Sequence, residues 1–387
     1  MPMTILVAPS GFKEGLDVSD VADAITRGVR RALPSAKIVV VPVFDGGEGF
    51  ARALARLSGG KMRKVTVTGP VGEPVRASYA TMTLDGRRTA AIEISAAAGL
   101  RLVPAHRRNL LRTTSRGVGE LIRAALDAKA ERILIGCGDS GVNDGGAGMA
   151  QALGVRFLNR RNKDIPPGGA ALASLDHIDV SGLDPRLKHV EIEVCVNIKN
   201  VLLGKQGVSR VFGPQKGATA AQVRELERAL QRYALCIRQA TGIKTAALPG
   251  GGASGGLGAG LHALLGAKLI ARYEFISRFI PLTKYIDQAD LIISAEGKID
   301  AQTCRGKIPG EIGRHAKERG KPLIVLAGAI GAGAEECYAH GISAFVSIID
   351  QPYGLADAIG GTRILLENCA EHLMRVVAVA QALPERS

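Results

Sequence analysis

Residues 131–154, ERILIGCGDSGVNDGGAGMAQALG, carry the clearest signals of the fold. Its apolar run at 133–136 predicts a buried strand of a parallel sheet, because such strands are covered on both faces and show no alternation. A glycine-dense loop with Asn143 and Asp144 at its tip follows, and a helix is expected from about Ala147. Glycines allow close approach to a ligand, and a helix start favours an anion, so this loop predicts a binding site.

Residues 136–141 also match the pattern GxGxxG of dinucleotide-binding proteins. That fingerprint should open directly into an apolar helix and be followed, about 20 residues on, by an acidic residue at the next strand end. Here three more glycines and the Asn143-Asp144 pair occupy the first helical turns, and Asp164 falls in a polar loop. NAD binding is therefore the weaker interpretation.

The chain ends share a strand–loop–helix rhythm that the middle lacks. Strands at 4–9 and 37–43, with a helix capped by Asp17 between them, predict a parallel α/β sheet. From about residue 64 to 94 apolar and polar residues alternate, which favours a small antiparallel or mixed β region. Thr219 and Gln222 predict a capping box at the start of a long helix. The strand–helix rhythm returns near residue 287, with strands expected at 291–295 and 323–326. We expect two α/β domains, one discontinuous (1–66 and 287–387) and the other inserted (67–286) with a mixed sheet.

The composition narrows the range of functions. The formal charge is +14, but the basic residues are scattered and aromatic residues make up only 4%, which favours a small anionic substrate over nucleic acid. Six widely spaced cysteines argue against a zinc site or a disulfide framework. With neither a signal peptide nor an apolar run of membrane length, the protein is expected to be cytoplasmic and without a membrane partner. The oligomeric state stays open, with a homodimer as one option.

Polar clusters follow the carboxyl ends of several predicted strands, the edge at which open α/β sheets bind ligands. The clusters pair Lys13 with Glu14, Asp45 with Glu48, Asn143 with Asp144, Asn197 with Asn200, and Glu296 with Asp300. Lys216, Arg305 and Lys307 add positive charge. Each residue alone is more often a turn or cap residue, but cations for phosphate, carboxylates for Mg²⁺ and a base for a hydroxyl are what phosphoryl transfer needs.

Eight motifs together resemble the bacterial two-domain glycerate kinases. They are APSGFKEGL (8–16), VPVFDGGEG (41–49), AIEISAAAGL (91–100), NDGGAGM (143–149), LGVRFL (153–158), FGPQKGAT (212–219), SGGLGAG (254–260) and EGKIDAQTCRGK (296–307). The resemblance implies that the discontinuous domain is flavodoxin-like (Rossmann-like). It also implies ATP- and Mg²⁺-dependent phosphorylation of D-glycerate, generally at the 2-hydroxyl, in a cleft between the domains.

The resemblance implies roles for individual residues. Catalysis is expected from Asp45, Asn197, Asp300 and Lys13, and the metal ligands from Glu296 and Asp300. Substrate or nucleotide binding is expected from Ser10, Glu48, Asn143, Asp144, Gly145, Gly146, Lys216, Gly255, Gly256, Arg305 and Lys307.

The chain also departs from the usual motifs of that family. Ser10 and Gly11 stand where Asp and Ser are usual, Asn197 replaces an aspartate, Asp139 is an added carboxylate, and Lys298 replaces an arginine. An amide cannot accept a proton, so loss of a general base at position 197 would cost about 10²- to 10⁴-fold in rate. The alternative to a working kinase is a relative that binds a hydroxy acid or nucleotide without efficient turnover.

Overall fold

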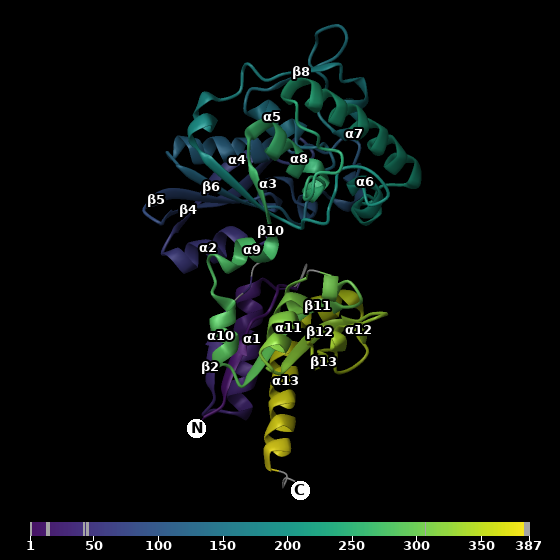
Figure 1. Ribbon diagram of the computed structural model, residues 1–387. Helices are drawn as coiled ribbons and strands as arrows, with labels where there is room; N and C mark the ends of the chain where they lie inside the picture. The colour runs from purple at the N-terminus through teal and green to yellow at the C-terminus, as the bar shows by residue number, and fades with distance from the viewer. Residues whose placement is uncertain (1, 13–15, 42, 44–45, 306, 383–387) are drawn as a thin grey trace. The chain divides into compact units, whose positions relative to one another are not determined.

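The structure is a computed structural model that describes the chain except residues 1, 13–15, 42, 44–45, 306 and 383–387. The chain forms two compact units (Figure 1). The first comprises Met1–Phe44 and Ile276–Ser387, and the second is Asp45–Phe275. Each unit has its own cluster of buried apolar side chains.

The chain passes from one unit to the other at residues 44/45 and 275/276. Both positions lie earlier than the boundaries at 66/67 and 286/287 that the sequence predicted. Strand β3 (Lys61–Thr68) pairs along its length with β4 (Pro74–Leu84), so its residues belong to the sheet of the second unit. Helix α10 (Leu282–Gln288) packs on β1 (Thr4–Val7) of the first unit. Hydrogen bonding of β3 therefore sets the first boundary, and packing of α10 sets the second.

The first unit contains a five-stranded parallel sheet in the order β2-β1-β11-β12-β13. Besides β1, its strands are β2 (Lys37–Val40), β11 (Leu291–Ile299), β12 (Leu323–Ile330) and β13 (Ala344–Ser347). Numbered within the unit, this is the order 2-1-3-4-5 of flavodoxin-like folds, with its switch point between β1 and β11. The discontinuous flavodoxin-like sheet expected from the sequence is confirmed.

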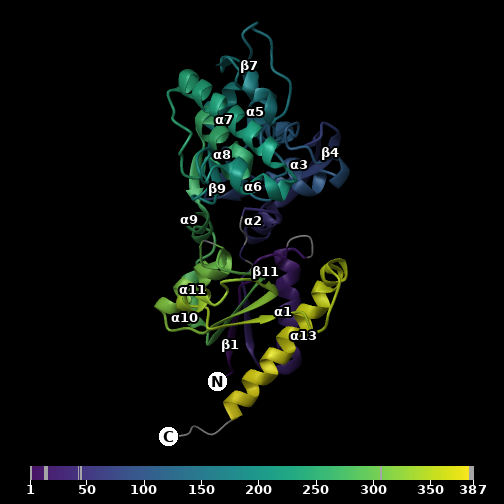
Figure 2. The ribbon, with the colours of Figure 1, turned by 90° about the vertical axis from the view of Figure 1, so that its right-hand side faces the viewer.

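Helices cover both faces of this sheet (Figure 2). On one face α1 (Val18–Ala32) and α13 (Leu355–Ala382) lie side by side, and on the other are α10 and α11 (Ile308–Glu318). The short helix α12 (Glu336–Ala339) follows β12. As predicted, Asp17 caps α1, accepting a hydrogen bond from the Asp20 amide at 2.9 Å.

The prediction that β11 ends at Ala295 is wrong, and so is the prediction that β12 ends at Leu326. The two strands continue together as a parallel pair, with Glu296 opposite Ala327 and Ile299 opposite Ile330. Each continuation supplies the hydrogen-bonding partner of the other, which outweighs the glycines in both segments. Glu296 therefore lies inside a strand and not in a loop after one.

The second unit contains a six-stranded mixed sheet in the order β10-β9-β6-β5-β4-β3. Its remaining strands are β5 (Arg87–Glu93), β6 (Arg132–Gly136), β9 (Glu191–Val196) and β10 (Lys268–Ala271); β7 (Arg156–Leu158) and β8 (His177–Asp179) form a separate pair. The pairs β3–β4 and β4–β5 are antiparallel, and the other pairs of the large sheet are parallel. The mixed character expected for the inserted unit is confirmed.

In this unit α2 covers one face of the sheet, and α4 and α8 cover the other (Figure 1). The helices are α2 (Phe50–Ser58), α3 (Ser95–Ala98), α4 (Arg116–Asp127), α5 (Ala147–Ala152), α6 (Val208–Phe212), α7 (Ala220–Thr241) and α8 (Ala253–Leu265), and α9 (Arg272–Ser277) continues past the end of the unit at Phe275. The capping box predicted at Thr219 and Gln222 opens α7. The predicted strand and helix of residues 131–154 are β6, fully buried between β5 and β9, and α5.

Candidate active site

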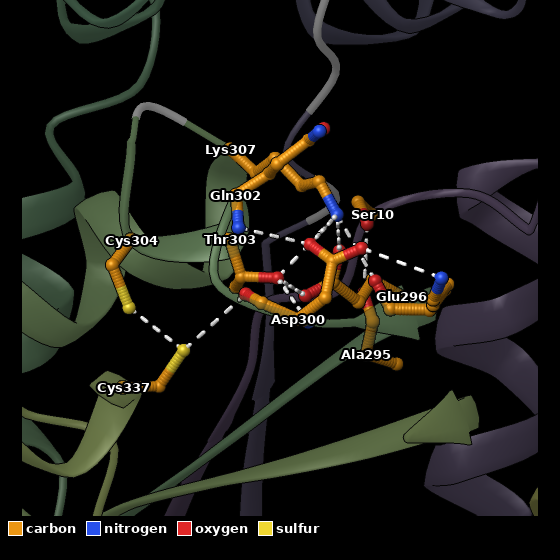
Figure 3. A network of polar contacts seen from close by, with 10 residues as sticks. Ser10, Ala295, Glu296, Asp300, Gln302, Thr303, Cys304, Lys307 and Cys337 are labelled. Atoms are coloured by element: carbon orange, nitrogen blue, oxygen red, sulfur yellow. Dashed lines mark hydrogen bonds and ion pairs between the residues drawn. The ribbon is translucent and has the colours of Figure 1, made fainter. Parts of the chain in front are cut away.

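A cluster of two carboxylates and a lysine lies at the carboxyl end of β11 (Figure 3). Glu296 is near the end of the strand, Asp300 follows it directly, and Lys307 is the residue before α11. The Lys307 ammonium donates to Glu296 Oε2 at 3.2 Å and to Asp300 Oδ1 at 3.3 Å. It also donates to the carbonyl oxygen of Lys298 at 3.0 Å, so the protein itself occupies the donors of Lys307.

Thr303, which was not among the residues predicted from the sequence, links the Glu296 carboxylate to the backbone amide of Asp300. It lies in the short 3₁₀ turn Thr303–Arg305 and is fully buried. Its hydroxyl donates to Glu296 Oε1 at 2.7 Å and accepts a bond from the Asp300 amide at 3.1 Å. A threonine three residues after an aspartate is a common turn pattern, and this was the signal available in the sequence.

The two carboxyl groups differ in acidity. Burial raises the pKa of Glu296, and the nearby Lys307 and Thr303 only partly offset that effect. Burial also acts to raise the pKa of Asp300, but Lys307, the Gln302 amide and Lys298 together bring it below its ordinary value. Two neighbouring acids with oppositely shifted pKa values are typical of acid–base sites.

Ser10 joins this cluster from β1, the strand beside β11. Its amide and its hydroxyl both donate to the carbonyl oxygen of Ala295, at 2.9 and 2.8 Å. The residue therefore lies at the switch point of the sheet, next to Glu296 (Figure 3). Lys298, more than half exposed, approaches Asp300 Oδ2 to 3.7 Å from the other side.

In the second unit Asp144 is completely buried at the start of α5. Its carboxylate accepts from the Ser115 amide at 2.7 Å, from the Ser115 hydroxyl at 2.9 Å and from the amides of Gly146 and Gly148. Burial raises the pKa of Asp144 in spite of these four donors. Its bonds hold the loop against the start of α4 and cap α5.

Lys216 and Asn143 are buried polar groups beside this loop. The Lys216 ammonium donates to Ser140 Oγ and to the carbonyl oxygen of Val142, both at 3.0 Å. Burial lowers the pKa of Lys216 to about 8, and the charge of Asp144 acts in the opposite direction. Asn143 donates to Ser209 Oγ at 2.9 Å, while its buried Oδ1 has no donor among the described residues.

The predicted binding glycines interlock with one another and with nearby side chains. Gly145, Gly146, Gly255 and Gly256 all have positive φ. A Cβ on Gly255 would lie 2.0 Å from the carbonyl oxygen of Val142, and one on Gly145 would lie 2.3 Å from the Tyr233 ring. Close packing of the loop before α5, against the start of α8 for Gly255 and against Tyr233 of α7 for Gly145, is thus sufficient reason for glycine at these two positions.

The other predicted site residues are spread over separate loops. Asn197 Oδ1 accepts from the Lys199 amide at 3.1 Å, which closes a turn after β9. The exposed Glu48 side chain pairs with Arg101 at 3.3 Å, and its amide donates to Asp139 at 3.3 Å. Lys13, Asp45 and the side chain of Arg305 lie outside the described residues.

Sequence reasoning also missed Glu93, an acidic residue in the apolar end of β5. Its carboxylate accepts from the Ala51 amide at 2.9 Å, near the start of α2. Burial raises the pKa of Glu93, and the amides of Ala51 and Gly49 partly oppose this. The sequence signal was a single acid within the run AAIEIS.

The structure brings the predicted residues together in two groups. Ser10, Glu296, Asp300 and Lys307 meet at the switch point of the first unit. The group in the second unit contains Asn143, Asp144, Gly145, Gly146, Lys216, Gly255 and Gly256. Within the described residues no three His, Cys, Asp or Glu side chains are grouped as a metal site, and no helix has the length and apolar character to cross a membrane.

Two carboxylates and a lysine at the switch point of a flavodoxin-like sheet lie at the edge where α/β proteins of this class bind their ligands. The model of the glycerate kinase family matches residues 5–378. The chain belongs to this family of kinases.

Individual relatives are similar to this chain over nearly its whole length. A glycerate kinase of Bacillus subtilis (strain 168) is 44% identical over 98% of this chain and 99% of its own length. A glycerate 2-kinase of Escherichia coli (strain K12) is 45% identical over 93% and 94%. A crystal structure from Salmonella typhimurium LT2, itself a proposed glycerate kinase 2, has a TM-score of 0.79 at 42% identity and covers 99% of this chain and 100% of its own.

Proposed function

We propose that the protein transfers the γ-phosphoryl group of ATP to the 2-hydroxyl of D-glycerate. Its family supports phosphorylation of glycerate, and the relative named glycerate 2-kinase, 45% identical, supports the 2-hydroxyl as acceptor. The observation that carries the proposal is the convergence of Glu296 and Asp300 on one positive charge at the switch point of the first unit.

This convergence fits a Mg²⁺ site of the kind used in phosphoryl transfer. Mg²⁺ is commonly held by one or two carboxylates and completed by substrate phosphates and water. Asp300 Oδ1 already accepts from the Lys307 ammonium group at 3.3 Å, so this oxygen is placed to hold a cation, with Glu296 Oε2 beside the same position. When bound, the ion supplies charge compensation for the phosphate oxygens.

The different pKa shifts divide the roles of the two carboxylates. Asp300, with its lowered pKa, is the more firmly charged group and the proposed metal ligand. Glu296, with its raised pKa, is the stronger base and the proposed acceptor of the hydroxyl proton. Thr303 holds the other oxygen of Glu296 at 2.7 Å and so fixes the direction in which this base points.

The remaining residues have proposed roles in binding or in catalysis. Lys216 supplies a buried positive charge, and Asn143 Oδ1 is a buried acceptor that faces no donor among the described residues. These properties support a subsite for a polar ligand group in the second unit. Lys13, Asp45 and Arg305 keep the roles that the family resemblance implies.

The direct test is ADP release with ATP, Mg²⁺ and D-glycerate. We expect turnover by the wild type, and a kcat reduced by about 10²- to 10⁴-fold in Glu296→Gln, with thermal stabilisation by ligands retained. Ligand-induced stabilisation without turnover in the wild type would overturn the kinase and support a non-catalytic binder. ³¹P NMR of the product separates 2- from 3-phosphoglycerate and tests the position of transfer.

Asn197→Asp tests the amide that stands in place of an aspartate. Aspartate can accept the same hydrogen bond from the Lys199 amide, so the turn is expected to persist. We expect kcat to rise, by less than the about 10²-fold that a sole general base contributes, because Glu296 remains as the proposed base. An unchanged kcat would remove position 197 from the catalytic set.

A further inference from the structure

Two cysteine thiols are in contact next to the carboxylate–lysine cluster (Figure 3). Cys304 lies in the turn Thr303–Arg305, and Cys337 lies in α12, 33 residues further along the chain. Their sulfur atoms are 2.7 Å apart, and no disulfide joins them. The sulfurs need to move by less than about 1 Å to reach a disulfide bond of roughly 2.05 Å.

The two thiols differ in access to solvent. Cys337 is completely buried, whereas Cys304 is partly exposed. Cys337 Sγ also approaches the carbonyl oxygen of Asp300 at 3.7 Å, so it lies under the turn that carries the acidic cluster. An exposed thiol with a buried thiol directly behind it is the arrangement of an attacking and a resolving cysteine.

We propose that Cys304 and Cys337 form a reversible disulfide, with a small-molecule disulfide as the oxidant. The Cys304 thiol loses its proton and attacks one sulfur of the oxidant, which forms a mixed disulfide and releases one thiol. The Cys337 thiol, deprotonated in turn, attacks Cys304 Sγ and releases the second thiol. Two protein thiols are thereby oxidised to one disulfide, and one oxidant disulfide is reduced to two thiols.

The position of this bond gives it a consequence for catalysis. A disulfide would tie the turn that carries Thr303 to α12, and Thr303 holds Glu296 through its hydroxyl. Oxidation is therefore expected to lower kcat on the order of tenfold or more, an effect typical of disturbing groups that orient metal-site ligands. This consequence rests on the proposed kinase function, whereas formation of the disulfide does not.

The first experiment detects the bond without any assay of activity. The full-length protein is incubated with oxidised glutathione, and its unreduced peptides are identified by mass spectrometry. We expect a peptide pair joined through Cys304 and Cys337, and a fall from six free thiols to four. Oxidation at other cysteines without this pair would overturn the proposal.

Single serine variants test the order of the two steps. In Cys337→Ser the mixed disulfide of Cys304 with glutathione should accumulate, whereas Cys304→Ser should leave Cys337 unmodified. Cys369→Ser, which changes a cysteine on α13, is the matched control and should behave as the wild type. Equal modification of Cys337 in the absence of Cys304 would contradict the proposed order, and circular dichroism checks that each variant is folded.

Activity is then compared between oxidised and dithiothreitol-treated protein. Wild type and Cys369→Ser should lose activity on oxidation and regain it on reduction. Cys337→Ser cannot form the disulfide and should not show the loss of activity that depends on it. A disulfide that leaves kcat unchanged would overturn only the catalytic consequence. Absence of turnover in the fully reduced wild type would overturn the proposed function and leave the disulfide in place.

Discussion

Thr303 is the residue on which the geometry of the acidic cluster depends most directly. Its side chain is completely buried, and its single hydroxyl both donates to Glu296 and accepts from the Asp300 backbone. Donation to the carboxylate favours the charged form of Glu296 and works against the effect of burial on its pKa. Replacement of this hydroxyl should therefore change the pKa of Glu296 as well as the position of its side chain.

We predict that Thr303→Val shifts the acid limb of the pH–rate profile to higher pH. The proposed base acts in its deprotonated form, so activity falls as pH drops through the pKa of Glu296. Loss of the donor raises this pKa further, so protonation begins at a higher pH, and kcat should fall about 10- to 100-fold. Thr303→Ser keeps the hydroxyl, so the acid limb of its pH–rate profile should stay where it is in the wild type. If the acid limb of Thr303→Val were also unshifted, Thr303 would contribute only packing.

Lys216 provides a pH-dependent test of burial in the second unit. Its pKa is about 8 in the folded protein, below the ordinary value of 10.5. Between these pH values the unfolded chain holds a proton that the folded chain has lost, so folding stability gains as pH rises through this window. Relative to Lys216→Met, the wild type should gain up to about 3 kcal/mol between pH 8 and 10.5 in urea unfolding. If the difference in unfolding free energy between the two proteins did not change with pH, the lowered pKa of the buried Lys216 would be contradicted.

At the residue scale, spacing in the sequence was enough to group Glu296, Asp300 and Lys307 in one site segment. It could not supply contacts between distant parts of the chain. The pairing of Cys304 with Cys337 depends on the return of α12 to the turn Thr303–Arg305. The bonds from Lys216 to the loop before α5 depend on the contacts that α6 and α7 make with this loop through Ser209 and Tyr233. Such partners are set by tertiary structure, which a local pattern does not encode.

At the scale of elements, helices α1 and α13 are in contact through a glycine. A Cβ on Gly28 would lie 2.2 Å from the carbonyl oxygen of Glu367 and 2.8 Å from the Ala370 Cβ. The contact is reinforced by Arg27 and Arg31, which bond to the buried carboxylate of Glu367 at 2.6 and 3.0 Å. The backbones of the two helices therefore meet without an intervening side chain.

We predict that Gly28→Ala lowers the free energy of unfolding of the first unit by about 1 to 3 kcal/mol, the usual cost of an overpacked contact. Gly360→Ala is the matched control, because its added methyl group meets no atom within 4 Å. Alanine is favoured over glycine inside a helix by about 1 kcal/mol, so the control should be neutral or stabilised. Equal effects of the two substitutions in urea unfolding would mean that the helices can move apart at little cost.

Element prediction succeeded where local chemistry was decisive, as at the Asp17 cap and the capping box of α7. It failed at the ends of β11 and β12, where each strand is extended by pairing with the other. Glycine in the segments 296–299 and 327–330 favoured loops in the sequence. The parallel ladder overrides that preference, and it is this extension that places Glu296 within the sheet.

At the scale of the molecule, the two apolar clusters share no residue, and each belongs to one unit. We therefore expect two unfolding transitions in urea, resolved by hydrogen exchange followed with mass spectrometry. Gly28→Ala should shift the transition reported by peptides of the first unit, and peptides of the second unit should keep their midpoint. A single transition shifted for all peptides would show that the units unfold as one cooperative body.

The domain organisation followed from the sequence because the strand–helix rhythm is interrupted and then resumes. The domain boundaries could not be located accurately from the sequence, because β3 has the same local pattern whichever sheet it joins. Its pairing partner β4 decides the matter. Likewise α10 contacts β1, which is far away in sequence.

The strand β1 has β11 as a neighbour, with Ile5 opposite Leu291. During synthesis from the N-terminus, at about 5 to 20 residues per second, β1 leaves the ribosome about 15 to 60 s before this partner is made. All of Asp45–Phe275 emerges in that interval and can complete its own sheet. The opening strands of the chain must wait, exposed to chaperones and to aggregation, until the last quarter of the chain is translated, and the cluster at Glu296 is among the last features of the enzyme to be assembled.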